Sequence, residues 1–193
     1  MSTAVQASIE WYAPRQEWNP IHARVDTSSE WYGAQLERSG FLRDADHHAD
    51  MPVRRNGIVA QALVRVLIPG MIRIDDYSTD LYHGDHTYDV VSGTVTGMPS
   101  PSQDIIIPHK KEKKQFPPDR FYAVRVNHPD YWLIGWVEYE RFWHLCKRDP
   151  PWSNNHHPDD GYLGFEHFTQ LPLPDSFNPP PAIQVFGQGI GGR

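Results

Sequence analysis

The sequence predicts one domain of α/β (α+β) class, with helices packed on a set of adjacent strands. Three observations predict it. Two helical patterns occupy residues 27–69, six short runs rich in β-branched and aromatic residues follow, and another helical pattern covers 138–146. The chain of 193 residues is long enough for one domain with a substantial core, whereas two full domains would be cramped.

The first two helices are bounded by different signals. For the first, Thr27 or Ser28 is the N-cap candidate, and the helix is expected to end near Ser39 and Gly40. The second is expected after Asn56, from Ile58 to Ile68, where Pro69-Gly70 would stop it. Its apolar positions form one continuous stripe: Ile58, Val59, Ala62, Leu63, Val66 and Leu67.

Six segments predict strands because β-branched and aromatic residues dominate them and turn residues separate most of them. They are Met71–Ile74, Tyr88–Val91, Thr94–Met98, Ile105–Ile107, Phe121–Val126 and Tyr131–Val137. In the last strand, alternation places Trp132, Ile134 and Trp136 on one face, where all three are expected to be buried. The helix after it should direct Phe142 and Leu145 inward.

The two ends of the chain predict appendages. Residues 1–26 carry Trp11, Tyr12 and Trp18 without a clear period, which is typical of an irregular arm that docks through aromatic side chains. Residues 150–193 are rich in proline and end in a glycine-rich run, so a Pro-rich extension with few regular elements is expected. The expected domain is therefore 27–149, with the arms bound to a protein partner, to a second copy of the chain, or to the domain itself.

Charge, hydropathy and cysteine content exclude several classes of protein. The net charge of -6 excludes a uniformly basic surface. One dense basic strip contains Lys110, Lys111, Lys113 and Lys114, and it fits either a solvated hairpin tip or a loop that contacts nucleic-acid phosphates. With a mean hydropathy of -0.61, no stretch approaches the roughly 18 apolar residues of a membrane span. The N-terminus lacks a signal-peptide pattern and Cys146 is the single cysteine, so a cytoplasmic location is expected.

Four motifs carry a resemblance to a known family. From about Arg54 to Phe168, their order and spacing resemble small PD-(D/E)XK nuclease-like proteins, which are common in tailed-phage genomes. The motifs are the helix NGIVAQALV, the stretch from Asp89 to Thr94-Val95-Thr96, the apolar strand with a basic end IIIPHKK, and the hairpin FYAVRVNHPDYWLIGWVEYERFW. The resemblance implies a mixed sheet flanked by helices. It also implies a magnesium site built from an Asp on one strand and, after a turn, an acid and a Lys at alternate positions on the next.

The resemblance implies that only Asp89 of the family's site residues is retained. Gln61 stands where the helix of the family carries an acid, and Thr94 and Thr96 stand in the acid and lysine positions. A single carboxylate would bind Mg²⁺ poorly, since the ion usually takes one or two carboxylates with water and substrate phosphate. The favoured expectation is a phage-type accessory, structural or binding protein on a degenerate scaffold without efficient catalysis or a cofactor, found in the host cytoplasm or the virion.

The alternative is a Mg²⁺-dependent DNA endonuclease with a rearranged site. Acids near Asp89 in the sequence can take over the missing positions, and Asp85 is the first candidate to share a metal with Asp89. The other acids in reach are Asp75, Asp76, Asp80 and Asp104. Lys110 offers a replacement amine. His83 and His86 add a weaker signal for Zn²⁺, Mn²⁺ or Ni²⁺, although a glycine-containing turn with hydrogen-bonded histidines is the favoured explanation. Convergence of carboxylates from separate chain segments on Asp89 would favour the enzyme.

Overall fold

A seven-stranded sheet forms the centre of the computed structural model, which describes residues 18–39, 51–73, 80–148, 157–170 and 178–186. The strand order is β2-β3-β4-β6-β7-β1-β9. These strands are β1 (Ile21–Val25), β2 (Ile72–Arg73), β3 (Leu81–His83), β4 (His86–Thr94), β6 (Arg120–Asn127), β7 (Asp130–Glu138) and β9 (Ile183–Phe186). Strands β4 and β6 are parallel and the other neighbouring pairs are antiparallel. The expected α/β (α+β) class is confirmed.

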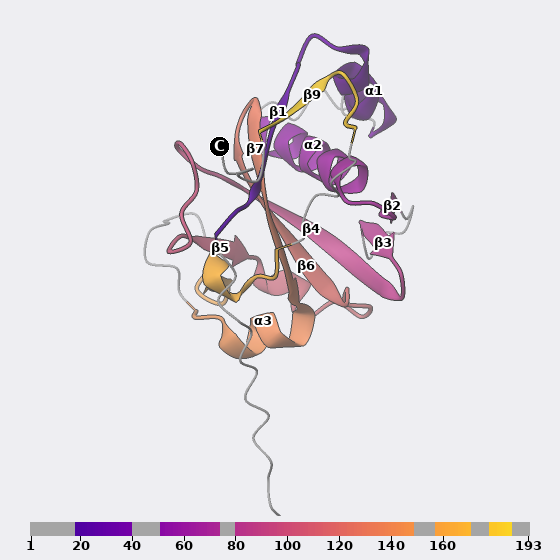
Figure 1. Ribbon diagram of the computed structural model, residues 1–193. Helices are drawn as coiled ribbons and strands as arrows, with labels where there is room; N and C mark the ends of the chain where they lie inside the picture. The colour runs from indigo at the N-terminus through magenta and orange to yellow at the C-terminus, as the bar shows by residue number, and fades with distance from the viewer. Residues whose placement is uncertain (1–17, 40–50, 74–79, 149–156, 171–177, 187–193) are drawn as a thin grey trace, which may run out of the picture.

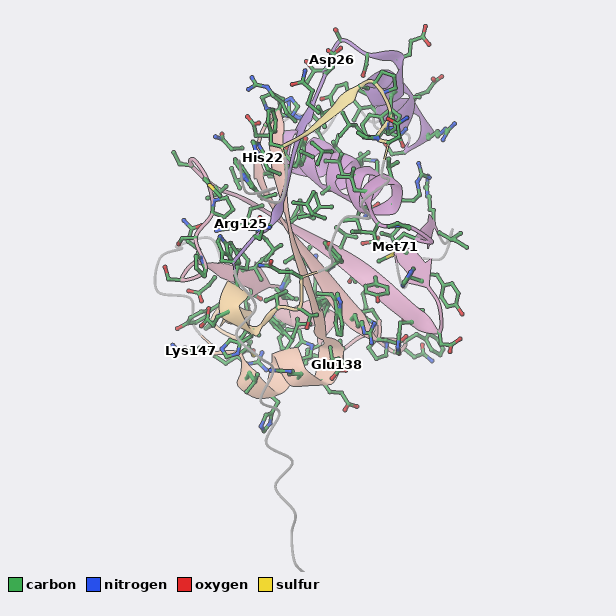
Figure 2. All side chains as sticks on the ribbon, in the orientation of Figure 1. His22, Asp26, Met71, Arg125, Glu138 and Lys147 are labelled. Atoms are coloured by element: carbon green, nitrogen blue, oxygen red, sulfur yellow. The ribbon has the colours of Figure 1, made fainter. Side chains whose placement is uncertain are left out.

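The two faces of the sheet bury separate cores. Figure 1 shows the elements that cover each face. Helices α1 (Glu30–Arg38) and α2 (Met51–Leu67) cover one face. The other carries the two-stranded sheet of β5 (Asp104–Ile107) and β8 (Gly161–Gly164), with α3 (Tyr139–Leu145) and the short 3₁₀ helices η2 (His109–Lys111) and η3 (Phe165–His167). The helix-side core includes Val59, Leu63, Leu67, Tyr122, Val124 and Tyr131. The core on the face of the two-stranded β5–β8 ribbon, called the ribbon-side core below, includes Ile105, Ile107, Phe121, Ile134, Phe142 and Leu163. Figure 2 shows Asp26, after β1, and Glu138, at the end of β7, at opposite ends of the molecule.

Both helices on the first face start at different residues from those expected. Ser29 caps α1, because its Oγ accepts a hydrogen bond from the backbone N–H of Tyr32 at 3.2 Å. Helix α2 begins at Met51, and the predicted start after Asn56-Gly57 is wrong. A Cβ on Gly57 would lie 3.7 Å from Ser92 Oγ, so this residue sits where α2 approaches β4. Tertiary packing thus overrides the low helix propensity of glycine.

Strand β4 is continuous, which corrects the expected turn between two strands at 88–91 and 94–98. Its pairing with β6 is unbroken from Tyr88 opposite Arg120 to Thr94 opposite Val126. Gly93 lies within this ladder beside Arg125, whose guanidinium occupies the space that a side chain at Gly93 would need. The glycine therefore accommodates a neighbouring side chain and does not form a turn.

A β-bulge in β7 changes which side chains face each core. Ala123 pairs with Gly135 and the next residue, Val124, pairs with Leu133, so Ile134 is the extra residue. Trp132 and Ile134 are buried in the ribbon-side core as expected, but Trp136 shifts to the helix side and is only half-buried. In α3, Phe142 is buried as predicted. Leu145 is 38% exposed, so its predicted inward position is wrong.

The described parts of both predicted appendages belong to the domain. Strand β1 lies between β7 and β9, and His22 is stacked between the rings of Trp132 and Phe186 at 4.8 and 4.6 Å. Trp18 stacks on Phe165, 5.9 Å between ring centroids. Strands β8 and β9 lie within the supposed extension, so the boundaries at 26/27 and 149/150 separate no structural units here. Trp11 and Tyr12 lie outside the described residues.

Candidate carboxylate and lysine site

Asp80 and Asp89 face each other across the hairpin of β3 and β4. Leu81 pairs with Tyr88, which makes Asp80 and Asp89 the next opposed positions along the ladder. The backbone N–H of Asp80 donates to Tyr88 O at 2.9 Å, and that of Val90 donates to Asp80 Oδ2 at 2.7 Å. Both the backbone and the carboxylate of Asp80 are therefore fixed relative to β4.

Strand alternation and a tight turn bring the two acids together. His83 pairs with His86, and the intervening Gly84 has φ +61°, which glycine adopts at little cost. Tyr88 and Val90 point into the helix-side core, so Asp89 points to the opposite face, under η2. Asp89 is only 3% exposed. A hydrogen bond joins its carboxyl group to that of Asp80.

Burial affects the two carboxyl groups differently. Desolvation, followed by the negative charge of Asp89, raises the pKa of Asp80 to about 7. Burial alone would also raise the pKa of Asp89. The charge of Lys111, the hydrogen bond from Asp80 and the charge of Lys114 outweigh it and hold the pKa of Asp89 below its ordinary value. Between the pKa of Asp89 and that of Asp80, the pair therefore consists of a protonated Asp80 and an ionised Asp89.

Two lysines reach Asp89 from the connection between β5 and β6. Lys111 Nζ lies 2.7 Å from Asp89 Oδ2, and Lys114 Nζ lies 3.2 Å from the same oxygen. Lys110 and Lys113 are exposed. The predicted basic strip is thus divided into an inward pair and an outward pair, and the amine proposed for Lys110 is supplied by Lys111 and Lys114.

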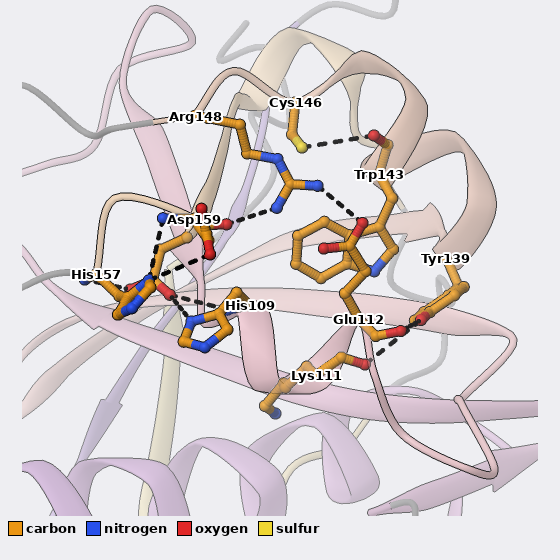
Figure 3. Close-up of polar contacts among 10 residues, drawn as sticks. His109, Lys111, Glu112, Tyr139, Trp143, Cys146, Arg148, His157 and Asp159 are labelled. Carbon is orange, nitrogen blue, oxygen red and sulfur yellow. Dashed lines mark hydrogen bonds and ion pairs between the residues drawn. The ribbon is translucent and has the colours of Figure 1, made fainter.

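The backbone that carries Lys111 is held in place by side chains from later segments (Figure 3). The backbone N–H and the Nδ1 of His109 both contact Asp160 Oδ1, at 2.8 and 2.9 Å. Tyr139 Oη donates to the backbone oxygen of Glu112 at 2.7 Å, and Arg148 binds the Glu112 carboxylate at 2.8 Å. Residues in α3, just after it and just before β8 thereby fix η2 over the sheet.

The other predicted site residues lie apart from Asp89 or at its margin. Asp85 is exposed in the hairpin turn, so the expected pairing of Asp85 with Asp89 is replaced by that of Asp80 with Asp89. Thr94 ends β4 and Thr96 follows it. Both are exposed, and Thr94 is about 16 Å along the strand from Asp89. Gln61 lines a small cleft that Asp80 also lines. Asp75 and Asp76 lie outside the described residues.

The donor set suits a hard divalent cation but is not a preformed cage. Within the described ranges, no group of three or more His, Cys, Asp or Glu side chains is placed to hold a metal, and this includes His83 and His86. Asp80 and Asp89 supply two carboxylates, the number that Mg²⁺ commonly takes together with water and phosphate. Two ammonium groups and one proton more than offset the negative charge of these carboxylates, and a cation would compete with them.

Comparisons with known proteins add no relative from which a role could be transferred. No protein-family model matches the sequence, and no curated protein matches it at a significant level. In the described part of the chain, no helix is long and apolar enough to cross a membrane.

Proposed function

We propose that this chain is a nuclease-like protein of the PD-(D/E)XK type, in which Asp80 and Asp89 hold a divalent cation for hydrolysis of nucleic-acid phosphodiesters. The observation that carries the proposal is the opposition of the buried Asp89 carboxylate and the partly buried Asp80 carboxylate, with two lysine amines on Asp89. A second carboxylate beside Asp89 supports the enzyme, which the sequence left as the alternative.

The geometry supports a different register of the family motif from the one that the sequence spacing suggested. The pattern of an Asp, a turn, and then an acid and a Lys at alternate positions fits Asp80, the turn at Gly84, and Asp89-Val90-Val91. Asp89 becomes the second acid, and Val91 occupies the lysine position in the ribbon-side core. Lys111 and Lys114 approach the same carboxylate from another segment. This supports the view that the amine of the family's lysine is supplied here from a different position in the chain.

The surrounding residues support the same assignment. Gln61 stands at the position where the family's helix carries an acid, and it lines the same small cleft as Asp80. This register of the motif needs the helix position to lie near Asp80. A divalent cation bound here would polarise a phosphoryl oxygen and lower the pKa of a bound water. Lys111 and Lys114 would stabilise the negative charge that develops on the phosphate. Asp80 would give up its proton when the cation binds, because its pKa is near neutrality.

The second candidate is a phage-type accessory or binding protein that does not cleave, acting in the host cytoplasm or the virion. One specific observation favours it: a protonated Asp80, an ionised Asp89 and two ammonium groups carry a net positive charge. Such a cluster attracts phosphate but repels Mg²⁺. The scaffold would then bind nucleic acid or a protein partner without hydrolysis.

Cleavage assays distinguish the two candidates. With Mg²⁺ or Mn²⁺, we expect the wild-type protein to cleave duplex or single-stranded DNA, and Asp80→Asn or Asp89→Asn to lower the rate at least about 100-fold. Asp85→Asn removes a nearby acid that is exposed in the turn, and it should leave the rate unchanged. Absence of cleavage with either cation, by a folded wild-type protein that retains DNA binding, would favour the accessory protein.

A further inference from the structure

We propose that Lys111 and Lys114 make nucleic-acid binding and cation binding mutually dependent. In the free protein both amines bind the Asp89 carboxylate. When a nucleic acid binds, its phosphate becomes the partner of these amines, so that the Asp89 carboxylate can bind the cation. The inference rests on the proposed function and specifies how the same site is regulated by its substrate.

The contact geometry makes the lysines and the cation competitors. Both amines lie on one oxygen, Oδ2 of Asp89, at 2.7 and 3.2 Å. A Mg²⁺ ion bound to this oxygen would lie about 2.1 Å from it. Two ammonium groups bound to the same oxygen would strongly repel the ion. At least one amine must therefore leave Asp89 before the cation is held tightly.

A phosphate group is the natural new partner for the displaced amine. Breaking a buried ion pair without replacement is costly, because it leaves a charge unpaired. A phosphate oxygen restores a charge-assisted hydrogen bond to the lysine. The Lys111 and Lys114 side chains are 20% and 27% exposed, so they connect buried Asp89 with the surface on which a phosphate would arrive.

The exchange requires side-chain movement only. His109 is held by Asp160, and Glu112 is held by both Tyr139 and Arg148, so the backbone around Lys111 is anchored on each side. Lys110 and Lys113 belong to the same segment but point outward. They supply general attraction for a polyanion without touching Asp89, and this makes them the matched control.

The coupling is reciprocal by thermodynamic linkage. If DNA strengthens cation binding by some factor, the cation strengthens DNA binding by the same factor. The typical range for such coupling is about 5- to 150-fold. The Lys111–Asp89 and Lys114–Asp89 pairs are the physical element through which each ligand affects the other.

Calorimetric titration with Ca²⁺ tests the inference, since Ca²⁺ takes the same oxygen ligands as Mg²⁺. For the wild-type protein, we expect a duplex of about 12 base pairs to lower the Kd for Ca²⁺ at least about 5-fold. For Lys111→Met with Lys114→Met, Ca²⁺ should bind more tightly than to wild type without DNA, and the duplex should no longer change its Kd. Lys110→Met with Lys113→Met removes the same charge and should keep the coupling.

The possible failures are distinguishable. Ca²⁺ binding to wild type that the duplex does not tighten overturns the coupling alone, as does full coupling in the Lys111/Lys114 double variant. If neither wild type nor the double variant binds Ca²⁺, with or without DNA, the proposed cation site is overturned and the coupling with it. If the double variant does not fold by circular dichroism, Lys114→Met alone is used. Its coupling should be weaker than that of wild type, and equal coupling overturns the inference.

Discussion

Asp80 and Asp89 hydrogen-bond to each other across one hairpin, and the Lys111 and Lys114 amines both lie on Asp89. The asymmetry follows from position. Asp89 lies beneath Lys111 and Lys114, whereas Asp80 precedes β3 and its carboxylate accepts a hydrogen bond from the backbone N–H of Val90. Two carboxyl groups in contact thus hold their protons over different pH ranges, which has a measurable effect on stability.

Stability should fall as the pH rises from about 4 to 7 because of Asp80. Its carboxyl group has an ordinary pKa of 3.8 when unfolded and about 7 when folded, so the folded state binds more protons in this interval. Asp80→Asn keeps a donor for Asp89 without a charge, and it should raise the melting temperature at about pH 8 with little effect at about pH 4. The expected gain at the higher pH is on the order of 1 kcal/mol or more. Equal pH profiles for the two proteins, measured by thermal melting, would contradict the assignment.

Gly135 should not tolerate a side chain. It lies at the bulge with φ +138°, and a Cβ would overlap the backbone oxygen of Thr169, which accepts a hydrogen bond from Trp136 N. Gly135→Ala should destabilise the protein by at least about 3 kcal/mol, because backbone strain and steric overlap combine. Gly33→Ala is the control. Gly33 lies in α1, and a Cβ added there would meet no atom of another described segment within 4 Å, so alanine should add up to about 1 kcal/mol. Similar melting temperatures for both variants would mean that the bulge is misplaced.

Tyr122→Phe should stabilise the domain or leave its stability unchanged. The Tyr122 hydroxyl is fully buried on β6 and has no hydrogen-bond partner among the described residues. Removing it eliminates a desolvated polar group without removing the ring, for an expected gain of up to about 1 kcal/mol in the free energy of unfolding. Urea unfolding measures this quantity. A loss above about 1 kcal/mol would reveal a hydrogen bond to this hydroxyl.

Deleting residues 1–26 should unfold the protein. The sequence favoured a dispensable arm, but the deletion removes β1 from between β7 and β9, together with the Trp18–Phe165 contact. Deleting residues 1–17 keeps both features and should leave a folded domain. Circular dichroism and light scattering distinguish these outcomes. A shortened protein that lacks 1–26 and melts like wild type would restore the interpretation of this segment as an arm.

Elements with local stabilising signals could be predicted from the sequence. The stripe from Val59 to Leu67 marked most of α2, and the β-branched and aromatic runs marked β5, β6 and β7 within one or two residues. Phe142 was correctly placed in the core. Strands β1, β8 and β9 have only four or five residues each, and all three pair with segments far away in the chain. Their stability comes from that non-local pairing, which a local pattern does not report.

The choice of charged groups that form the site depends on tertiary structure. Asp89 stood out in the sequence, but Asp85 was expected as its partner ahead of Asp80, and strand register puts Asp80 opposite Asp89 and Asp85 in the turn. Lys111 and Lys114 are 22 and 25 residues from Asp89, and the connection between the parallel strands β4 and β6 brings them over it. The sequence determines the residue types. Their protonation states and their pairing depend on burial and on distances that exist only after the sheet has formed.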